Sequence, residues 1–103
     1  MEIQTLNPTV QEIITFLEST PDVNSALARL LEKQLDRELT IYEQMDASYQ
    51  KQYGMSFDEF YRSPLMQQPS FNVEQDYFDW EMATTLIKVL RAHLAKVKRF
   101  IEP

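Results

Sequence analysis

Four carboxylates form two pairs at a spacing that could hold a metal ion. Asp46 follows Glu43 by three residues, and Asp79 follows Asp76 by the same interval. Residues three apart lie on one face of an α-helix, and carboxylate oxygens are the ligands that Mg²⁺ prefers. If the two pairs faced each other, the chain could hydrolyse a nucleotide as helical nucleotide pyrophosphohydrolases do. This hypothesis is kept as an alternative, because such pairs arise easily by chance among 16 acidic residues.

Other groups that could support catalysis are scarce. The chain has no cysteine, which excludes disulfides, thiolate metal ligands and a cysteine nucleophile. His93 is the single histidine, and no Glu stands three residues before it, so it does not match the ligand set of a di-iron bundle. One glycine is too few for a phosphate-binding loop. We therefore expect a protein that is not an enzyme and has no cofactor.

An acidic and aromatic segment, EQDYFDWEM at 74–82, has carboxylates on an unexpected side. On a helix whose core face includes Trp80, the side chains of Asp76 and Asp79 also face the core. A buried carboxylate costs several kcal/mol unless it is paired. Either these acids meet cationic groups of a partner, or this end of the helix projects beyond the core and its acids only complement the helix dipole.

The same segment has apolar side chains on the face that turns away from the core. Phe78 and Met82 lie there, and Val89 continues the stripe. An exposed apolar stripe favours association with another surface. We therefore expect a partner-binding surface that consists of Glu74, Asp76, Tyr77, Phe78, Asp79, Trp80, Glu81 and Met82.

Charge is distributed unevenly along the chain. The net charge is −6, with 15 acids and 5 bases in residues 1–87 but 1 acid and 5 bases in residues 88–103. Residues 1–28 resemble the ribbon-helix-helix layout of DNA-binding proteins in outline, yet they contain no Lys or Arg. Such a surface repels phosphates, so direct nucleic-acid binding is not expected. A basic cluster, interpreted as a solvated helix face, consists of Lys88, Arg91, Lys96, Lys98 and Arg99.

Hydropathy gives no indication of a membrane segment. No uncharged run approaches the roughly 18 residues that a spanning helix needs. The first ten residues, MEIQTLNPTV, have neither the basic region nor the apolar region of a signal peptide. With no cysteine in the chain, these features lead us to expect a cytoplasmic protein without membrane contact.

Composition and periodicity predict an all-α fold in a single helical domain over 1–103. Apolar residues recur every seven positions from Val73 to Ile101, with a second series three places behind, which predicts a helix over 72–101. Leucine, tyrosine and methionine at intervals of three and four predict another long helix over 24–53. We expect the two long helices to run antiparallel in a helical bundle that a dimer or a partner completes.

Two shorter helices are predicted over 8–20 and 57–63. Gly54 occupies the position where a left-handed residue ends the preceding helix, and Ser56 with Glu59 forms a capping box for the next one. The residues with this structural role are Gly54, Met55, Ser56, Phe57, Glu59 and Phe60.

The remaining segments are predicted to be irregular. Residues 63–70, SPLMQQPS, contain two prolines without periodicity and should form a loop. Asn72, with Gln75 three residues later, is expected to cap the final helix. Residues 1–6 form either a short strand or a frayed tail.

Two stretches, KQYGMSFDEF at 51–60 and VEQDYFDWE at 73–81, resemble a known family. They are similar to segments of small bacterial and archaeal antitoxins that are encoded beside TumE-type toxins, and the resemblance covers residues 45–90. It implies a small helical protein that binds and neutralises a toxin acting on nucleic acid or nucleotides. Such antitoxins often have a DNA-binding N-terminus, which the acidity of residues 1–28 does not favour. The matching positions are Gly54, Met55, Phe57, Phe60, Glu74, Asp76, Tyr77, Asp79, Trp80 and Glu81.

The leading hypothesis is a non-enzymatic interaction protein that neutralises a partner protein, for example a cognate toxin, and forms homo-oligomers. Carboxylates of the segment at 74–82 would meet Arg or Lys of the partner, while its apolar side chains supply buried area. The Mg²⁺-dependent hydrolase with Glu43, Asp46, Asp76 and Asp79 as ligands is one alternative. A purely structural homodimer that forms a four-helix bundle is the other.

Overall fold

The protein is all-helical in a computed structural model that describes residues 7–19 and 22–102. These residues form four α-helices and one 3-10 turn, without a strand, which confirms that the fold is all-α. The possible strand over residues 1–6 lies outside the described residues. None of the helices in the described part of the chain is both long and apolar enough to cross a bilayer. The elements are α1 (Pro8–Glu18), α2 (Val23–Tyr53), α3 (Phe57–Tyr61), η1 (Pro64–Met66) and α4 (Phe71–Ile101).

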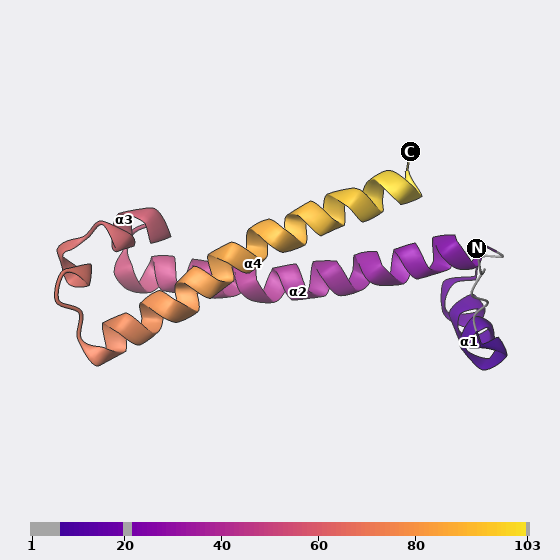
Figure 1. The fold of residues 1–103 in the computed structure, drawn as a ribbon, viewed down its shortest axis with the longest axis horizontal. Coiled ribbons are helices and arrows are strands. Elements are labelled where there is room, and N and C mark those ends of the chain that lie inside the picture. The colour runs from indigo at the N-terminus through magenta and orange to yellow at the C-terminus, as the bar shows by residue number, and fades with distance from the viewer. Residues whose placement is uncertain (1–6, 20–21, 103) are drawn as a thin grey trace, which may run out of the picture.

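Two helices of 31 residues each, α2 and α4, dominate the structure. They form an elongated hairpin of 57 × 28 × 26 Å, in which α4 returns along α2 (Figure 1). The short α3 and η1 occupy the closed end of the hairpin, and α1 packs on the first part of α2 (Figure 1). The two long helices diverge toward the opposite end, which is therefore open (Figure 1).

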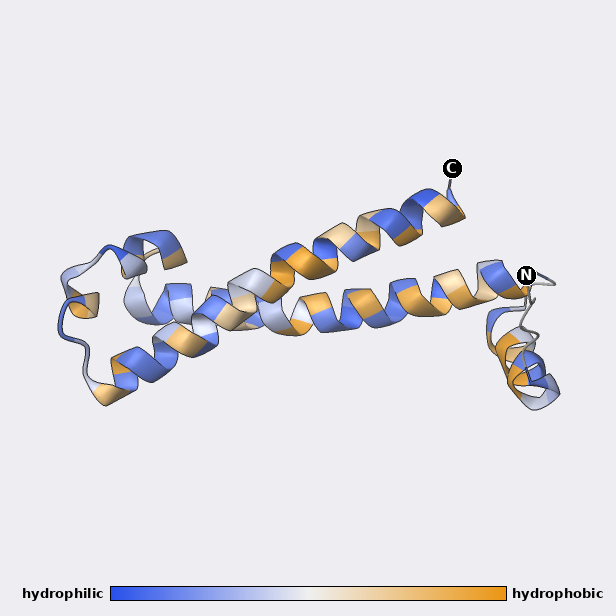
Figure 2. Ribbon diagram, in the orientation of Figure 1, coloured by the Kyte–Doolittle hydropathy of each residue, from blue (hydrophilic) through white to orange (hydrophobic). Residues whose placement is uncertain are grey.

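The core changes in character along the hairpin. At the closed end it is aromatic, and Trp80 and Phe60 are the largest fully buried side chains there. Midway it is aliphatic, where Leu39 packs with Ile87 and Leu94. Hydrophobic and hydrophilic residues alternate along both long helices (Figure 2), so each buries only one side against the other.

The boundary between α2 and α3 follows the sequence prediction. Gly54 has φ 69°, a left-handed conformation, and its N–H donates to the carbonyl of Gln50 at 2.7 Å, which ends α2. The Ser56 hydroxyl then accepts from the N–H of Glu59, whose carboxylate accepts from the N–H of Ser56, both at 3.2 Å. This capping box starts α3.

Other predicted boundaries need correction. Ser70, not Asn72, caps α4, because its hydroxyl accepts from the N–H of Val73 at 3.2 Å and places Asn72 inside the first turn. Within the predicted loop, Pro64–Met66 form a 3-10 turn, which the fixed φ of the leading proline favours. The short helices end earlier than expected, α1 at Glu18 and α3 at Tyr61.

Replacing Gly54 tests the left-handed turn that ends α2. A Cβ at this position would meet no atom within 4 Å, so the backbone conformation alone opposes a side chain. Gly54→Ala should lower the free energy of unfolding by about 1–2 kcal/mol. Gly54→Asn is the matched control and should cost less, because Asn tolerates this conformation. Urea denaturation measures both, and equal stability of Gly54→Ala and wild type would contradict the prediction.

Candidate functional site

Trp80 lies at the centre of an aromatic cluster and is fully buried. Tyr49 and Tyr53 of α2 stack on it, with ring centroids 5.4 and 5.9 Å away. Phe57 and Phe60 of α3 contact it at 5.4 and 5.1 Å. The indole is therefore part of the core. Trp80 was predicted to bind a partner, but its ring cannot contact one directly, because α2 and α3 cover it.

Asp46 satisfies the polar atom of this buried indole. The Trp80 Nε1–H donates to the Asp46 carboxylate at 2.7 Å, and the Gln50 side-chain amide donates to the same carboxylate at 2.8 Å. A buried N–H without an acceptor would cost about 1–3 kcal/mol. Asp46 thus joins α2 to α4 and serves the fold.

Asp76 faces the core, as the sequence predicts, and finds its partners within the chain. Its carboxylate accepts from the Tyr53 hydroxyl at 2.5 Å and from the Gln52 amide at 3.2 Å. Burial, together with this hydrogen bond, raises the pKa of Tyr53 to about 12. Burial also raises the pKa of Tyr49, and the negative charges of Asp79 and Asp76 raise that pKa further. The core-facing acids therefore meet phenol groups of α2.

The four carboxylates of the hydrolase hypothesis do not form one site. In the described residues, no group of three or more acidic, histidine or cysteine side chains is arranged to hold a metal ion. Glu43 instead accepts from Arg91 at 2.8 Å, and Asp46 accepts from Trp80 at 2.7 Å. The convergence that this alternative requires is absent from the described part of the chain.

The outer face of the same helix turn is exposed. Phe78 is 53% exposed and Met82 is 44% exposed, and Val89 continues the uncovered stripe, as the sequence predicts. Glu74 and Glu81 are exposed on the same part of α4. Of the residues predicted to bind a partner, Glu74, Phe78, Glu81 and Met82 are therefore accessible, whereas Asp79 is only partly exposed.

Tyr77 joins this exposed face to the aromatic cluster. Its ring stacks on Phe57 at 5.8 Å and on Tyr61 at 5.9 Å. Its hydroxyl donates to the Glu81 carboxylate at 2.6 Å, and this bond raises the pKa of Tyr77 to about 12. Tyr77 and Glu81 therefore hold each other in place one turn apart on α4.

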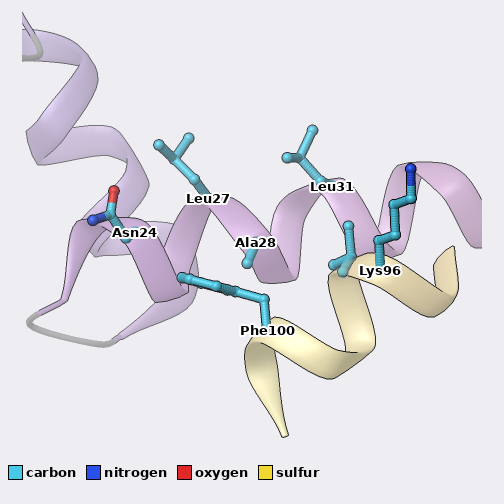
Figure 3. Close-up of a pocket in the computed structure, with 7 residues that line it drawn as sticks. Asn24, Leu27, Ala28, Leu31, Lys96 and Phe100 are labelled. Carbon is cyan, nitrogen blue, oxygen red and sulfur yellow. The ribbon is translucent and has the colours of Figure 1, made fainter. Parts of the chain in front are cut away.

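A second uncovered apolar region lies at the open end and was not predicted. A groove of about 390 Å³ separates the diverging ends of α2 and α4 (Figure 3). Leu31 and Phe100 are more than half exposed there, and Phe16 of nearby α1 is 81% exposed. Leucine periodicity on α2 indicates which side is apolar but gives no signal that the facing helix moves away. The groove is lined by Asn24, Leu27, Ala28, Leu31, Lys96, Val97 and Phe100.

Comparisons with known proteins leave the chain without an assigned family. No family model, curated protein or solved structure matches it.

Substitution of Asp46 tests its role as the acceptor of the Trp80 indole. Asp46→Ala leaves a buried N–H unpaired and should destabilise the protein by about 1–3 kcal/mol. Glu43→Ala, one turn earlier on α2, removes an exposed ion pair with Arg91 and should cost about 1 kcal/mol or less. Urea unfolding followed by Trp80 fluorescence compares the two variants. Equal losses of unfolding free energy in the two variants would show that the indole hydrogen bond stabilises the protein no more than an exposed ion pair does.

Tyr53 should make stability depend on pH in the alkaline range. Its pKa is about 12 in the folded chain and about 10 when unfolded. The stabilisation is therefore complete below about pH 10 and is lost as the pH rises toward 12. Tyr53→Phe removes this dependence. Tyr77 titrates in the same range, but its contribution is the same in wild type and in Tyr53→Phe and cancels when their stabilities are subtracted. The difference in unfolding free energy should shrink between about pH 10 and pH 12, and a constant difference would refute the assignment.

Proposed function

We propose that this protein is a non-enzymatic interaction protein that binds and neutralises a partner protein, as an antitoxin does. The observation that carries the proposal is the exposed pair Phe78 and Met82, which sits among carboxylates at the start of α4. Support for the antitoxin class comes from the resemblance of residues 51–60 and 73–81 to TumE-associated antitoxins.

The surface combines two kinds of interaction. Phe78 and Met82 would supply apolar area, which is the main favourable term in association. Glu74 and Glu81 would meet Arg or Lys of the partner and favour correct orientation. A basic partner also agrees with the net charge of −6.

The interior beneath this surface keeps it in one shape. Trp80, which lies between Phe78 and Met82 in sequence, is fully buried, and Asp76 accepts hydrogen bonds from Tyr53 and Gln52. Because the helix backbone is already ordered, binding requires little further ordering of the backbone, which reduces the entropic cost of association. The buried residues thus contribute to binding through the fold, and the exposed ones through contact.

Double substitution of the exposed pair tests this surface. Phe78→Ser with Met82→Ser should reduce affinity for the protein encoded by the neighbouring gene at least about tenfold, since two apolar contacts are removed. Ile41→Ser is the control, because Ile41 is similarly exposed, at 49%, on α2. Co-purification of the tagged chain with the co-expressed neighbour is the measurement. Undiminished capture by the double variant would exclude the surface, and no capture by wild type would exclude the proposed partner.

Trp80 and Asp76 are unsuitable for the same experiment. Their replacement would disturb the aromatic cluster and the Tyr53 hydrogen bond, so a loss of binding would report on folding. Circular dichroism should show unchanged helix content for the Phe78 and Met82 double variant, because both side chains are already exposed.

A further inference from the structure

The exposed hydrophobic side chains of α4 lie on one narrow face. Those that are large and exposed in this helix, from 43% to 79%, occur at intervals of 7, 4, 7 and 11 residues. At 3.6 residues per turn these intervals place all of them within about 40° around the helix axis. The stripe extends well beyond the segment at 74–82, from the first turn of α4 to its last. It consists of Phe71, Phe78, Met82, Val89 and Phe100.

The stripe is symmetric about its own midpoint. Met82 and Val89 lie at equal distances from a point between residues 85 and 86, and so do Phe71 and Phe100. Phe78 has His93 as its counterpart, which is exposed on the same side of α4. In an interface with two-fold symmetry, residue i of one copy contacts residue j of the other, and j contacts i. The spacing of this stripe meets that requirement when two α4 helices run in opposite directions.

Charges beside the stripe favour the same orientation. Glu74 and Glu81 precede the midpoint, and three bases follow it on the same flank of the helix, namely Lys88, Lys96 and Arg99. Antiparallel pairing would bring Glu81 beside Lys88 of the second copy, and Glu74 beside its Lys96 and Arg99. Parallel pairing would instead bring the acidic first halves of the two helices to the same level, and likewise their basic second halves, which is unfavourable.

These charges are not engaged in ion pairs within the described part of the chain. The ion pairs there join Lys33 to Glu18 and Arg91 to Glu43. The flank of the stripe therefore has both signs of charge available to a second molecule.

We infer that a second copy of this chain packs antiparallel along the α4 stripe, with the two-fold axis between residues 85 and 86. The inference rests on the proposed function, because both treat Phe78 and Met82 as a contact face. In the isolated protein, this face would be covered by the second copy. A heterologous partner that binds there must displace the second copy. The homodimer and the partner complex are thus alternative states of one surface.

Engineered cysteines test the register directly, because the chain has none of its own. Met82→Cys and Val89→Cys are prepared as separate proteins and oxidised alone and as a mixture. In the antiparallel pair, position 82 faces position 89, so the mixture should form a disulfide dimer. Each protein alone should not, since identical positions lie about 10 Å apart along the axis, beyond the reach of a disulfide. Cross-linking of each variant with itself would indicate parallel pairing and overturn the inference, as would failure of the mixture to cross-link.

Charge substitutions provide an independent test by light scattering of the isolated, full-length chain. Wild type should be a dimer, and Met82→Lys with Val89→Lys should weaken the dimer by about a hundredfold, because like charges face each other. Met82→Lys with Val89→Glu restores opposite charges across the axis and should dimerise more tightly than the double-lysine variant. A monomeric wild type, or equal behaviour of the two double variants, would refute the antiparallel dimer.

The two proposals can fail separately. Light scattering and cross-linking use the chain alone, so their outcome does not depend on any heterologous partner. Co-purification with the neighbouring gene product decides the proposed function. A monomer that still captures its neighbour overturns only the homodimer, and a dimer that captures nothing overturns only the neutralising role.

Discussion

The packing of Trp80 between α2, α3 and α4 is the contact on which the rest of the structure depends. Its indole is fully buried, and its N–H is bound to Asp46. A buried tryptophan removes about 150–250 Å² from water, which is a large contribution in a chain of this length. The directional bond to Asp46 also sets how far α4 is shifted along α2. One residue thus provides both the stability of the closed end and the alignment of the long helices.

The open end follows from the same arrangement. Aromatic side chains from three helices hold the closed end together, whereas at the other end α2 and α4 diverge and leave Leu31 and Phe100 more than half exposed. The two ends have similar apolar periodicity. They differ in what covers them, because α3 packs over Trp80 and no element of the described chain fills the groove at the open end. Apolar surface is therefore left over on the outer side of α4 and between the helix ends.

Sequence patterns predicted the local features of this fold, such as helix ends, better than they predicted which helices pack against each other. The end of α2 at Gly54 and the capping box of Ser56 depend on a few adjacent residues, and both were predicted. The same holds for the core-facing side of Asp76 and the outward side of Phe78, which follow from helical periodicity. Periodicity does not reveal which helix covers a face. For that reason Trp80 was assigned to a contact surface although α3 buries it, and the groove at Leu31 was missed.

The acids of α4 and its apolar stripe have separate explanations. From sequence, core-facing carboxylates and an outward apolar stripe together suggested that this turn needs a partner. Asp76 does not need such a partner, because its carboxylate accepts hydrogen bonds from Tyr53 and Gln52. The proposal of a binding partner therefore rests on the exposed apolar stripe and the charges beside it, and not on the core-facing acids.

The shape of the molecule also agrees with the proposed association. The radius of gyration is 19.6 Å, whereas a compact domain of about 100 residues has a value near 13 Å. Such an extended hairpin has little interior for its length, since each long helix is covered on one side only. One or two further helices packed along α4 would bury the stripe from Phe71 to Phe100 and add a second layer to the hairpin. An elongated two-helix hairpin with a continuous exposed stripe has the shape expected of half of a helical bundle, which agrees with the proposed association through α4.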